Sequence, residues 1–435
     1  TGKVGMIGDS YWSWTQYAAA IAQPPHLACI CQQDSTPDFY RDVCFQGGLW
    51  HYEFLGRWIP YHTAQYLWPG PVEGKLPPMS LLEETFSRPY DGEWYRERSP
   101  WPRLDRIKVP VLSIAPQGGA MHFRGQLWAY QHLDTTKKLM VVPPTGFWSH
   151  VRYLTDKALN RQMLRWFDHW LKGIDTGIMA EPQVAIFDNA LREWRYENEY
   201  PVKRTQWTKL HLREGGALGD APTGAEKADS YRMPDAWAQI STGKPVLAYA
   251  TPPLEKPMRV WGPVSLTLHV SSTQPDTVFF AKIADIAPDG TARKLNRGIL
   301  KASFRALDAK LSAPGQPFHP FDKQELLEAG KVYELQIEMM PIFHTFRAGH
   351  RLRVEVASED IEYSNQLRQI DLQLLPWPVE NTIHHDREHP SHLTLPVVPD
   401  APEIAPVKAL LADIAWPLTP GAWSPNTDGW PLTDD

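Results

Sequence analysis

The sequence is poor in three features, each of which would indicate a different class of protein: cysteine, long apolar runs and blocks of basic residues. Its only cysteines are Cys29, Cys31 and Cys44. This odd, clustered set is a poor disulfide framework and, with no histidine at ligand spacing, a poor zinc site. Cys29 and Cys31 lie two apart in an apolar run, on one face of a predicted strand. We expect the three thiols to pack in a core.

No apolar run approaches the roughly 20 residues that cross a bilayer, so a membrane-spanning protein is not expected. A net charge of -6 without a basic block gives no footprint for nucleic acid or an anionic membrane. A signal peptide is also absent. Because the chain begins directly in a core-like strand, we expect its natural N-terminus to lie further upstream.

Aromatic residues and proline are abundant instead. The chain holds 19 Trp and 41 Pro among 435 residues, of which 43% are apolar and 22% charged. This is the composition of a globular protein with two or three domains. The Trp and Pro counts indicate long, shaped loops and aromatic-lined surfaces.

The opening residues carry the pattern around which the chain is organised. Residues 4–7 fit a buried parallel strand, residues 15–22 are an alanine-rich helix start, and Ser10 lies on the turn between them. A nucleophile elbow has this order of elements. The alternative is an ordinary glycine turn with a capping serine.

Small residues flank this serine on both sides. An elbow needs them because its backbone is strained and its strand and helix approach closely. Gly8 supplies one. Trp12 stands where G-x-S-x-G has its second glycine, but Ser13 is small one position later.

Further apolar runs continue an α/β pattern through the first half of the chain. We expect strands at 26–31, 109–114 and 138–142, and helices at 125–133 and 159–171, the last of them closed by Gly173. Strand, helix and strand within about thirty residues form a βαβ unit. The stretch 45–105 is rich in Trp, Tyr, Gly and Pro. We expect it to be an inserted cap that shapes an apolar or aromatic pocket, the alternative being a surface excursion with its own core.

Catalytic groups gather at the carboxyl ends of parallel strands. Asp34 and Asp38 follow the strand at 26–31, and His150 follows the strand at 138–142, which we interpret as the last of the sheet. In an α/β hydrolase the general base lies after the last strand, and the order Ser10 then His150 agrees. The alternative for His150 is an ordinary loop histidine.

From about residue 205 short alternating runs replace the helices. They lie at 207–212, 264–270, 278–283, 332–337 and 352–356, separated by turn signals such as Pro288-Asp-Gly290. This predicts a β-sandwich of jelly-roll type. We therefore expect an α/β-hydrolase domain over 1–204, with the cap at 45–105, and a jelly roll over 205–435.

The densest histidine group consists of His384, His385, His389 and His392. Its spacing fits neither a helical histidine pair nor a zinc finger, and its Asp, Arg, Glu and Pro neighbours predict a solvated loop. We expect no metal and no other cofactor.

Several motifs occur in one order along the chain: Gly8-Asp-Ser-Tyr11, Trp148-Ser-His150, the stretch RWFDHWLKG at 165–173, Pro263-Val264, and the segments 285–290 and 298–305. Together they resemble the CocE/NonD hydrolases, relatives of cocaine esterase, α-amino acid ester hydrolase and the X-Pro dipeptidyl-peptidases. The resemblance covers nearly the whole chain.

The resemblance implies a serine hydrolase that cleaves esters or amides. Ser10 would be the nucleophile, His150 its base, and the backbone N–H of Tyr11 one donor of the oxyanion hole. We expect Trp12, His122 and Trp148 to contact the substrate. Asp9, next to the nucleophile, would favour a cationic amine on the substrate, unless it only caps the loop.

The chain departs from the family pattern in its acid. The family's acid usually follows the strand at 109–114, but the loop 115–125 has no carboxylate, and Ala120 stands near the expected position. Losing that partner costs a triad orders of magnitude in rate. We expect the acid after the preceding strand, with Asp34 as first choice and Asp38 as second.

The chain also lacks the long segment that precedes the elbow in the family, which carries the first strands and a tyrosine that is the second oxyanion donor. Those residues would lie on another chain, or this chain is a fragment and unstable and inactive alone. We expect the substrate to be a small ester or amide, and we expect no nucleic acid or membrane as a partner. The chain could also form a homo-oligomer. Two other functions remain: a decayed homologue that binds a ligand or partner, and an acyl transferase using the same acyl-enzyme.

Overall fold

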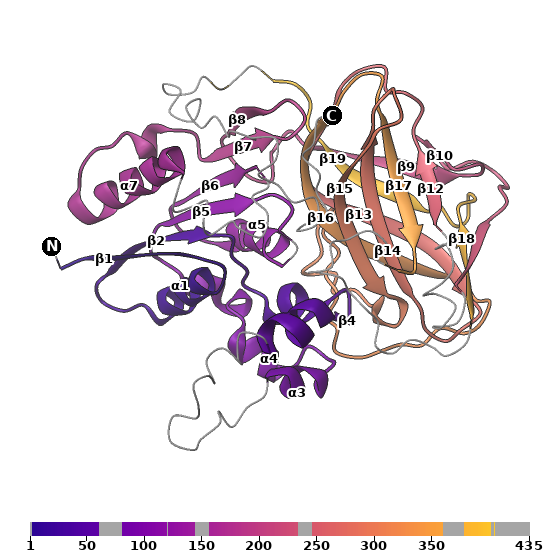
Figure 1. Cartoon of the computed structure of the whole chain (residues 1–435), viewed down its shortest axis with the longest axis horizontal. Helices are drawn as coiled ribbons and strands as arrows, with labels where there is room; N and C mark the ends of the chain where they lie inside the picture. The colour runs from indigo at the N-terminus through magenta and orange to yellow at the C-terminus, as the bar shows by residue number, and fades with distance from the viewer. Residues whose placement is uncertain are drawn as a thin grey trace.

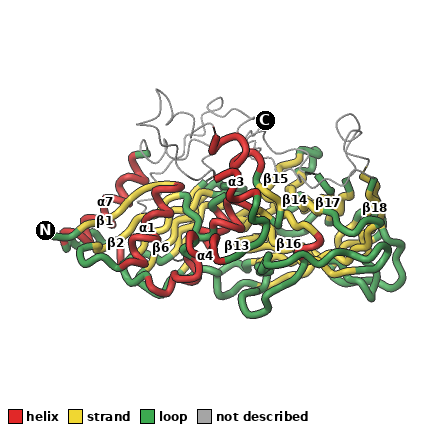
Figure 2. The backbone as a smooth tube through the Cα atoms, turned by 90° about the horizontal axis from the view of Figure 1, so that it is seen from below, coloured by secondary structure: helices red, strands yellow, loops and turns green. Residues whose placement is uncertain are grey.

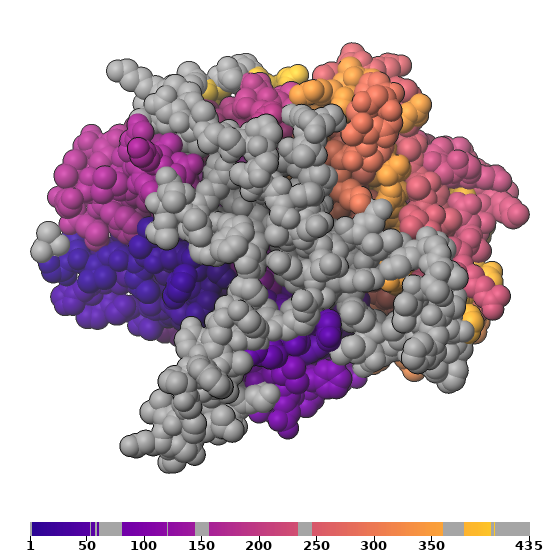
Figure 3. Space-filling view, viewed as in Figure 1, coloured from indigo at the N-terminus to yellow at the C-terminus, as the bar shows by residue number. Residues whose placement is uncertain are grey.

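The computed structural model describes residues 2–60, 81–119, 121–143, 156–233, 246–359, 378–401 and 404. These residues form two lobes that lie side by side, an α/β lobe that begins at the N-terminus and a β-rich lobe (Figures 1 and 3). Seen from below, the two lobes follow one another along the long axis of the molecule (Figure 2). Within the described residues, no helix combines the length and the apolar character needed to cross a membrane.

A six-stranded sheet forms the centre of the α/β lobe. Its strands, in spatial order, are β1 (Val4–Asp9), β2 (Leu27–Gln33), β5 (Val111–Pro116), β6 (Lys137–Val142), β7 (Val184–Asp188) and β8 (Glu193–Glu197). The first five are parallel and β8 is antiparallel. The expectation that the strand at 138–142 ends the sheet is therefore wrong, because the short apolar run of β7 continues it.

Helices cover both faces of this sheet. They are α1 (Ser10–Ala22), α5 (Phe123–His132) and α7 (Lys157–Lys172), and Gly173 ends α7 with a left-handed φ of 73°. Ile30 packs with α1 and α5, whereas its neighbours Cys29 and Cys31 pack with α7. Strands buried on both faces read as continuous apolar runs, as these do. All three cysteines are buried and free, which confirms the expectation of core thiols.

The segment between β2 and β5 is made of short helical turns. Its elements are the π-helix η1 (Phe39–Cys44), β3 (Phe45–Gln46), β4 (Leu49–Trp50), the π-helix η2 (Tyr52–Trp58), α3 (Leu81–Phe86), α4 (Glu93–Arg98) and the 3-10 helix η3 (Trp101–Arg106). Helices and loops thus dominate the described part of 45–105. Its aromatic side chains Tyr40, Phe45 and Tyr95 share one core with Phe304 and Phe321 of the β-rich lobe. The segment therefore joins the two lobes.

The β-rich lobe begins with β9 at Gln206. Its strands are β9 (Gln206–Arg213), β10 (Ala217–Gly219), β11 (Asp229–Met233), β12 (Leu247–Ala250), β13 (Met258–Ser272), β14 (Val278–Ile286), β15 (Ala292–Lys301), β16 (Tyr333–Phe346), β17 (Arg351–Ala357), β18 (Val379–His384) and β19 (His392–Val397). Two 3-10 turns, η4 (Ile178–Ala180) and η6 (Ala302–Phe304), complete the described elements of the chain.

The strands of this lobe close on themselves. The hydrogen-bonded order runs β13-β16-β15-β14-β17-β12-β10-β9-β19, and β19 also pairs with β13, so nine strands form a barrel with β18 and β11 attached. Leu266, Leu268 and Ile337 fill its interior. A β-rich C-terminal domain is confirmed, whereas the narrower expectation of a jelly roll stays a prediction.

The histidine group spans the end of β18, the connection 385–391 and the start of β19, two strands that both pair with β13. His384 is the last residue of β18 and His392 the first of β19. His385 is buried, with Nδ1 3.2 Å from Glu226 and Nε2 3.0 Å from Asp229. The expectation of a solvated loop is confirmed for Arg387 and Glu388, which are exposed, but it is wrong for His385, which is buried between two carboxylates. The described residues contain no group of three or more His, Cys, Asp or Glu arranged to hold a metal ion.

Candidate active site

Ser10 lies at the junction of β1 and α1, where the helix begins directly after the strand. Its φ is 51°, a left-handed conformation that costs a non-glycine residue about 1–3 kcal/mol and is typical of functional sites. This is the geometry of a nucleophile elbow. The sequence prediction of strand, tight turn and helix is confirmed, but the expectation that this strand is buried is wrong, because β1 is an edge strand of the described sheet and Val4 and Ile7 are exposed.

The small residues around Ser10 have a structural reason. A Cβ on Gly8 would lie 2.6 Å from the Cβ of Trp12, so only glycine fits there. Ser13 is buried on the side of α1 that faces β2, and its Oγ accepts a hydrogen bond of 3.2 Å from the backbone N–H of Gln33. The small side chain at position 13 therefore lets α1 pack closely on the sheet.

Asp34 is the first residue after β2 and lies beside the elbow. Its backbone carbonyl accepts the N–H of Ser10 at 3.1 Å, and its own N–H donates to the carbonyl of Ile114 at 3.1 Å. These bonds join the carboxyl ends of β1, β2 and β5. The φ of Asp34 is 46°, so its backbone is strained like that of Ser10.

His122 precedes the first residue of α5 and lies between these two side chains. Its Nε2 is 3.4 Å from Ser10 Oγ, at the long end of hydrogen-bond distance, and its Nδ1 is 3.3 Å from Asp34 Oδ2. Such contacts are often loose without substrate and tighten when it binds. Serine, histidine and aspartate thus lie in one row, in the order that a serine hydrolase requires.

The charges around His122 favour its protonated form. Burial is the largest single influence and lowers the pKa of the ring, but the carboxylates of Asp34, Asp42 and Asp9 together outweigh it, so the pKa is raised above its usual 6.5. A histidine base acts in its neutral form. A rate that depends on this ring should therefore fall as the pH drops through the raised pKa.

Tyr11 lies in the first turn of α1. The first N–H groups of a helix have no intrahelical acceptor and point towards the helix start, so they can bind a developing negative charge. The side chains of Tyr11 and Trp12 are 66% and 65% exposed. They offer aromatic surface next to Ser10.

The other predicted site residues have different positions. Asp38 is buried, accepts hydrogen bonds from the backbone N–H groups of Tyr40 and Arg41, and pairs with the Arg41 guanidinium at 3.0 Å. It is the N-cap residue of η1 and stabilises the first turn of that helix. His150 and Trp148 lie outside the described residues.

Sequence reasoning predicted a substrate contact for His122 and missed its contact with Ser10. A signal for that contact exists in the strand order. Asp34 follows β2 and His122 follows β5 by a short loop, and β2 pairs with β5 in the sheet. Loops after neighbouring parallel strands emerge at the same edge, so an acid and a histidine there are expected to meet.

Two family models match this chain, one after the other along the sequence. Residues 1–152 match the model of the X-Pro dipeptidyl-peptidase (S15) family, and residues 176–394 match that of the X-Pro dipeptidyl-peptidase C-terminal non-catalytic domain. Cocaine esterase from Rhodococcus sp. (strain MB1 Bresler) is 27% identical over 91% of this chain and 81% of its own length. A putative serine esterase of Mycobacterium bovis is 25% identical over 91% of this chain and 76% of its own length.

Solved structures agree on the fold. A CocE/NonD family hydrolase from Staphylococcus aureus has a TM-score of 0.80 at 22% identity, covering 92% of this chain and 72% of that one. An α-amino acid ester hydrolase has a TM-score of 0.70 at 18% identity, covering 91% and 76%. The architecture is that of an α/β hydrolase followed by a C-terminal β-rich domain.

Proposed function

Because this chain belongs to the CocE/NonD family of hydrolases, we propose that it cleaves an ester or amide through an acyl-enzyme on Ser10, with His122 as base and Asp34 as its orienting carboxylate. The observation that carries this proposal is the 3.4 Å approach of His122 Nε2 to Ser10 Oγ. A serine hydroxyl is a weak nucleophile until a base within hydrogen-bond reach takes its proton.

The reaction follows from the row of three side chains. Ser10 Oγ attacks the substrate carbonyl carbon while His122 Nε2 takes its proton, giving a tetrahedral intermediate. The protonated ring then gives that proton to the leaving alcohol or amine, and the bond to the leaving group breaks. Water repeats the same two steps on the acyl-enzyme. The Asp34 carboxylate keeps Nδ1 protonated and stabilises the imidazolium.

The oxyanion is stabilised by donors that are fixed before the reaction begins. We assign one of them to the backbone N–H of Tyr11, in the first turn of α1. Removing one donor from such a hole costs about 10²–10³ in rate. Exposed aromatic surface at Tyr11 and Trp12 supports a small, apolar or aromatic acyl group.

His150 remains the alternative base. Its address in the sequence, after β6, and the resemblance of Trp148-Ser-His150 to the family motif support it, whereas the Ser10 contact supports His122. The two assignments predict opposite results for single substitutions of His122 and His150.

We further propose that another strand completes the sheet next to β1. In the described part of the sheet β1 is an edge strand, and its apolar side chains Val4 and Ile7 are 55% and 52% exposed. Natural proteins cover such edges or pair them. The strand would come from a segment outside this sequence, from another chain, or from a second copy. Light scattering across a concentration series tests the last source: Ile7→Lys should abolish a dimer formed through this edge.

A decayed homologue was an alternative because the loop after β5 lacks an acid. The approach of Asp34 to His122 weakens that argument, since a carboxylate from the neighbouring strand takes the place of the missing one. An acyl transferase would use the same acyl-enzyme. Its products with an added amine would be amides instead of free acids.

The proposal is tested with a fluorophosphonate probe on the full chain. Intact mass should rise by one probe adduct, peptide mapping should place it on Ser10, and Ser10→Ala should prevent it. Ser13→Ala is the matched control, because Ser13 lies one helical turn on and is buried against β2. A chain that takes no adduct and hydrolyses no aryl ester, amino ester or peptide would support the decayed homologue.

A further inference from the structure

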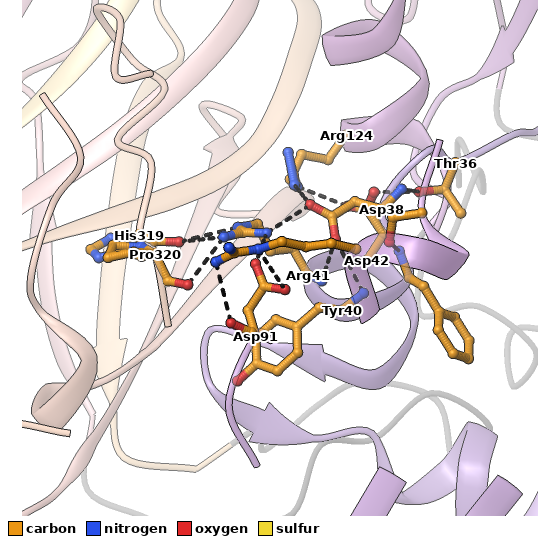
Figure 4. A network of polar contacts seen from close by, with 12 residues as sticks. Thr36, Asp38, Tyr40, Arg41, Asp42, Asp91, Arg124, His319 and Pro320 are labelled. Carbon is orange, nitrogen blue, oxygen red and sulfur yellow. Dashed lines mark hydrogen bonds and ion pairs between the residues drawn. The ribbon is translucent and has the colours of Figure 1, made fainter. Parts of the chain in front are cut away.

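One buried carboxylate contacts both segments that carry the partners of Ser10. Asp42 lies in η1, and its Oδ2 accepts a hydrogen bond from the hydroxyl of Thr36, two residues after Asp34. Its Oδ1 lies 2.8 Å from Nε of Arg124, two residues after His122. Figure 4 shows Thr36 and Arg124 converging on Asp42 from either side.

We propose that Asp42 is a positioning residue. It holds the loop after β2, through Thr36, against the first turn of α5, through Arg124, so that Asp34 and His122 meet at Ser10. This inference rests on the proposed function. It gives the η1 turn a role in the reaction through the two segments that Asp42 joins.

Close packing around Asp42 indicates a specific site. Its side chain is 2% exposed, and burying a carboxylate is costly unless it is paired and hydrogen-bonded. Gly125 makes the approach possible: a Cβ there would lie 2.0 Å from Asp42 Oδ2. A second bond joins the same two segments, since the N–H of Ser35 donates to Oε1 of Gln126 at 3.1 Å. The loop after β2 and the start of α5 are therefore fixed to each other.

The β-rich lobe holds the turn that carries Asp42. The Arg41 guanidinium pairs with Asp38 at 3.0 Å and Asp91 at 2.9 Å, and it donates to the carbonyls of His319 and Pro320 in the β-rich lobe (Figure 4). Its Cζ lies 4.2 Å from the centre of the Phe318 ring. The lobe described as non-catalytic in relatives thus contributes to the geometry of this site.

Arg124 reaches that lobe as well. Its Nη1 lies 3.7 Å from Oε1 of Glu338 on β16, and its Nη2 lies 3.9 Å from Oδ2 of Asp38.

Burial raises the pKa of Asp42, and the Arg124 guanidinium offsets part of that rise. Asp42 in turn favours protonation of His122, together with Asp34 and Asp9. Loss of the Asp42 charge should therefore lower the pKa of His122, an effect that a purely structural role of Asp42 would not produce.

The test compares Thr36→Val with Thr36→Ser, and adds Asp42→Asn. Valine matches the shape of threonine but loses the hydroxyl, whereas serine keeps it. Asparagine at 42 retains the shape but turns an N–H₂ or a neutral oxygen towards Arg124 Nε. The control is Arg213→Met, which removes an Arg–Glu pair of 2.7 Å inside the β-rich lobe. All variants are assayed well below their melting temperatures.

We expect Thr36→Val and Asp42→Asn to slow fluorophosphonate labelling of Ser10 by about 10- to 100-fold, because misplacement by about 1 Å costs up to 10²-fold. Turnover of an ester should fall in kcat more than it rises in KM. Thr36→Ser and Arg213→Met should label like the unmodified chain. In Asp42→Asn the acid limb of the pH profile should also move to lower pH.

A readout that needs no activity is the titration of the His122 ring by NMR, with His122→Asn to assign its signal. Its pKa should fall in Asp42→Asn and stay unchanged in Arg213→Met. The proposal would be overturned if Thr36→Val and Asp42→Asn both labelled at the rate of the unmodified chain and both left the pKa of His122 unchanged. If the unmodified chain takes no label, the proposed function fails, and the NMR titration still decides whether Asp42 acts on His122.

Discussion

Asp34 Oδ2 lies 3.3 Å from Nδ1 of His122, on the side of the ring opposite the nitrogen that faces Ser10. The two residues follow different strands, β2 and β5, which are neighbours in the sheet. Under the proposed function, this contact would supply the acid of the triad from the strand next to the elbow strand. It accounts for the absence of a carboxylate between β5 and α5 in the described part of that loop.

Asp34→Asn should reduce kcat/KM by roughly 10²–10⁴-fold, because an amide no longer holds the required tautomer of His122. Its carboxylate raises the pKa of the ring, so its loss should also move the acid limb of the pH profile to lower pH. The control is Asp400→Asn, whose side chain is 92% exposed and pairs with Arg259. Unchanged activity and an unchanged acid limb would remove Asp34 from the site.

Gly8→Ala should destabilise the elbow and slow Ser10 labelling. The added Cβ would lie 2.6 Å from that of Trp12, which forces the first turn of α1 to shift, and overpacking of this kind costs about 1–3 kcal/mol. Gly224→Ala is the control, since a Cβ there meets no atom within 4 Å. Chemical denaturation gives the free energy of unfolding of both. Equal values for the two variants would contradict the tight fit at Gly8.

Asp188→Ala should loosen the junction of the two lobes. This fully buried carboxylate belongs to the last residue of β7, and its Oδ2 accepts hydrogen bonds from Trp261 Nε1 at 3.0 Å and Thr345 Oγ1 at 2.6 Å, both in the β-rich lobe. Leaving two buried donors unsatisfied costs roughly 3 kcal/mol.

The control for Asp188 is Asp308→Ala. Both carboxylates accept hydrogen bonds from two backbone N–H groups just after them, but among the described residues Asp308 has no side-chain partner in the other lobe. Losing such a cap costs about 1 kcal/mol. A calorimetric scan in which both variants lose the same stability would show that the cross-lobe bonds contribute little.

The cysteines should be inert in the folded chain. Cys29, Cys31 and Cys44 are buried, and burial raises the pKa of each thiol, to about 12 for Cys29. Ellman's reagent should therefore detect no thiol before denaturation and all three after it. Fast reaction of the native chain, or loss of Ser10 labelling after thiol alkylation, would contradict this placement.

Sequence patterns predicted the elements that position Ser10 and Asp34, and the physical reason is local. The apolar runs of β1 and β2, the Gly8-Asp-Ser10 turn and the alanine-rich start of α1 each act within a few residues. The contact of His122 depends on which strands are neighbours, and that is a long-range property. The family resemblance also directed attention to His150.

In the β-rich lobe, too, sequence patterns predicted the strands but not which strands pair. Alternation along 264–270 in β13 and 332–337 at the start of β16 predicted strands, since the alternate apolar side chains of these stretches pack in the core. The closing pair β13–β19 joins residues from opposite ends of the lobe, and no local pattern specifies that register. The role proposed for Asp42 depends likewise on a turn between two strands and on a lobe that starts far along the chain.

The most direct measurement is the rate of fluorophosphonate labelling of Ser10 against pH in His122→Gln and His150→Gln. The contact between Ser10 and His122 predicts that His122→Gln loses roughly 10²–10⁴-fold in rate and its acid limb, as expected for a lost general base. His150→Gln should retain that limb. If His150→Gln abolishes labelling and His122→Gln leaves both rate and limb intact, His122 is not the base of this site.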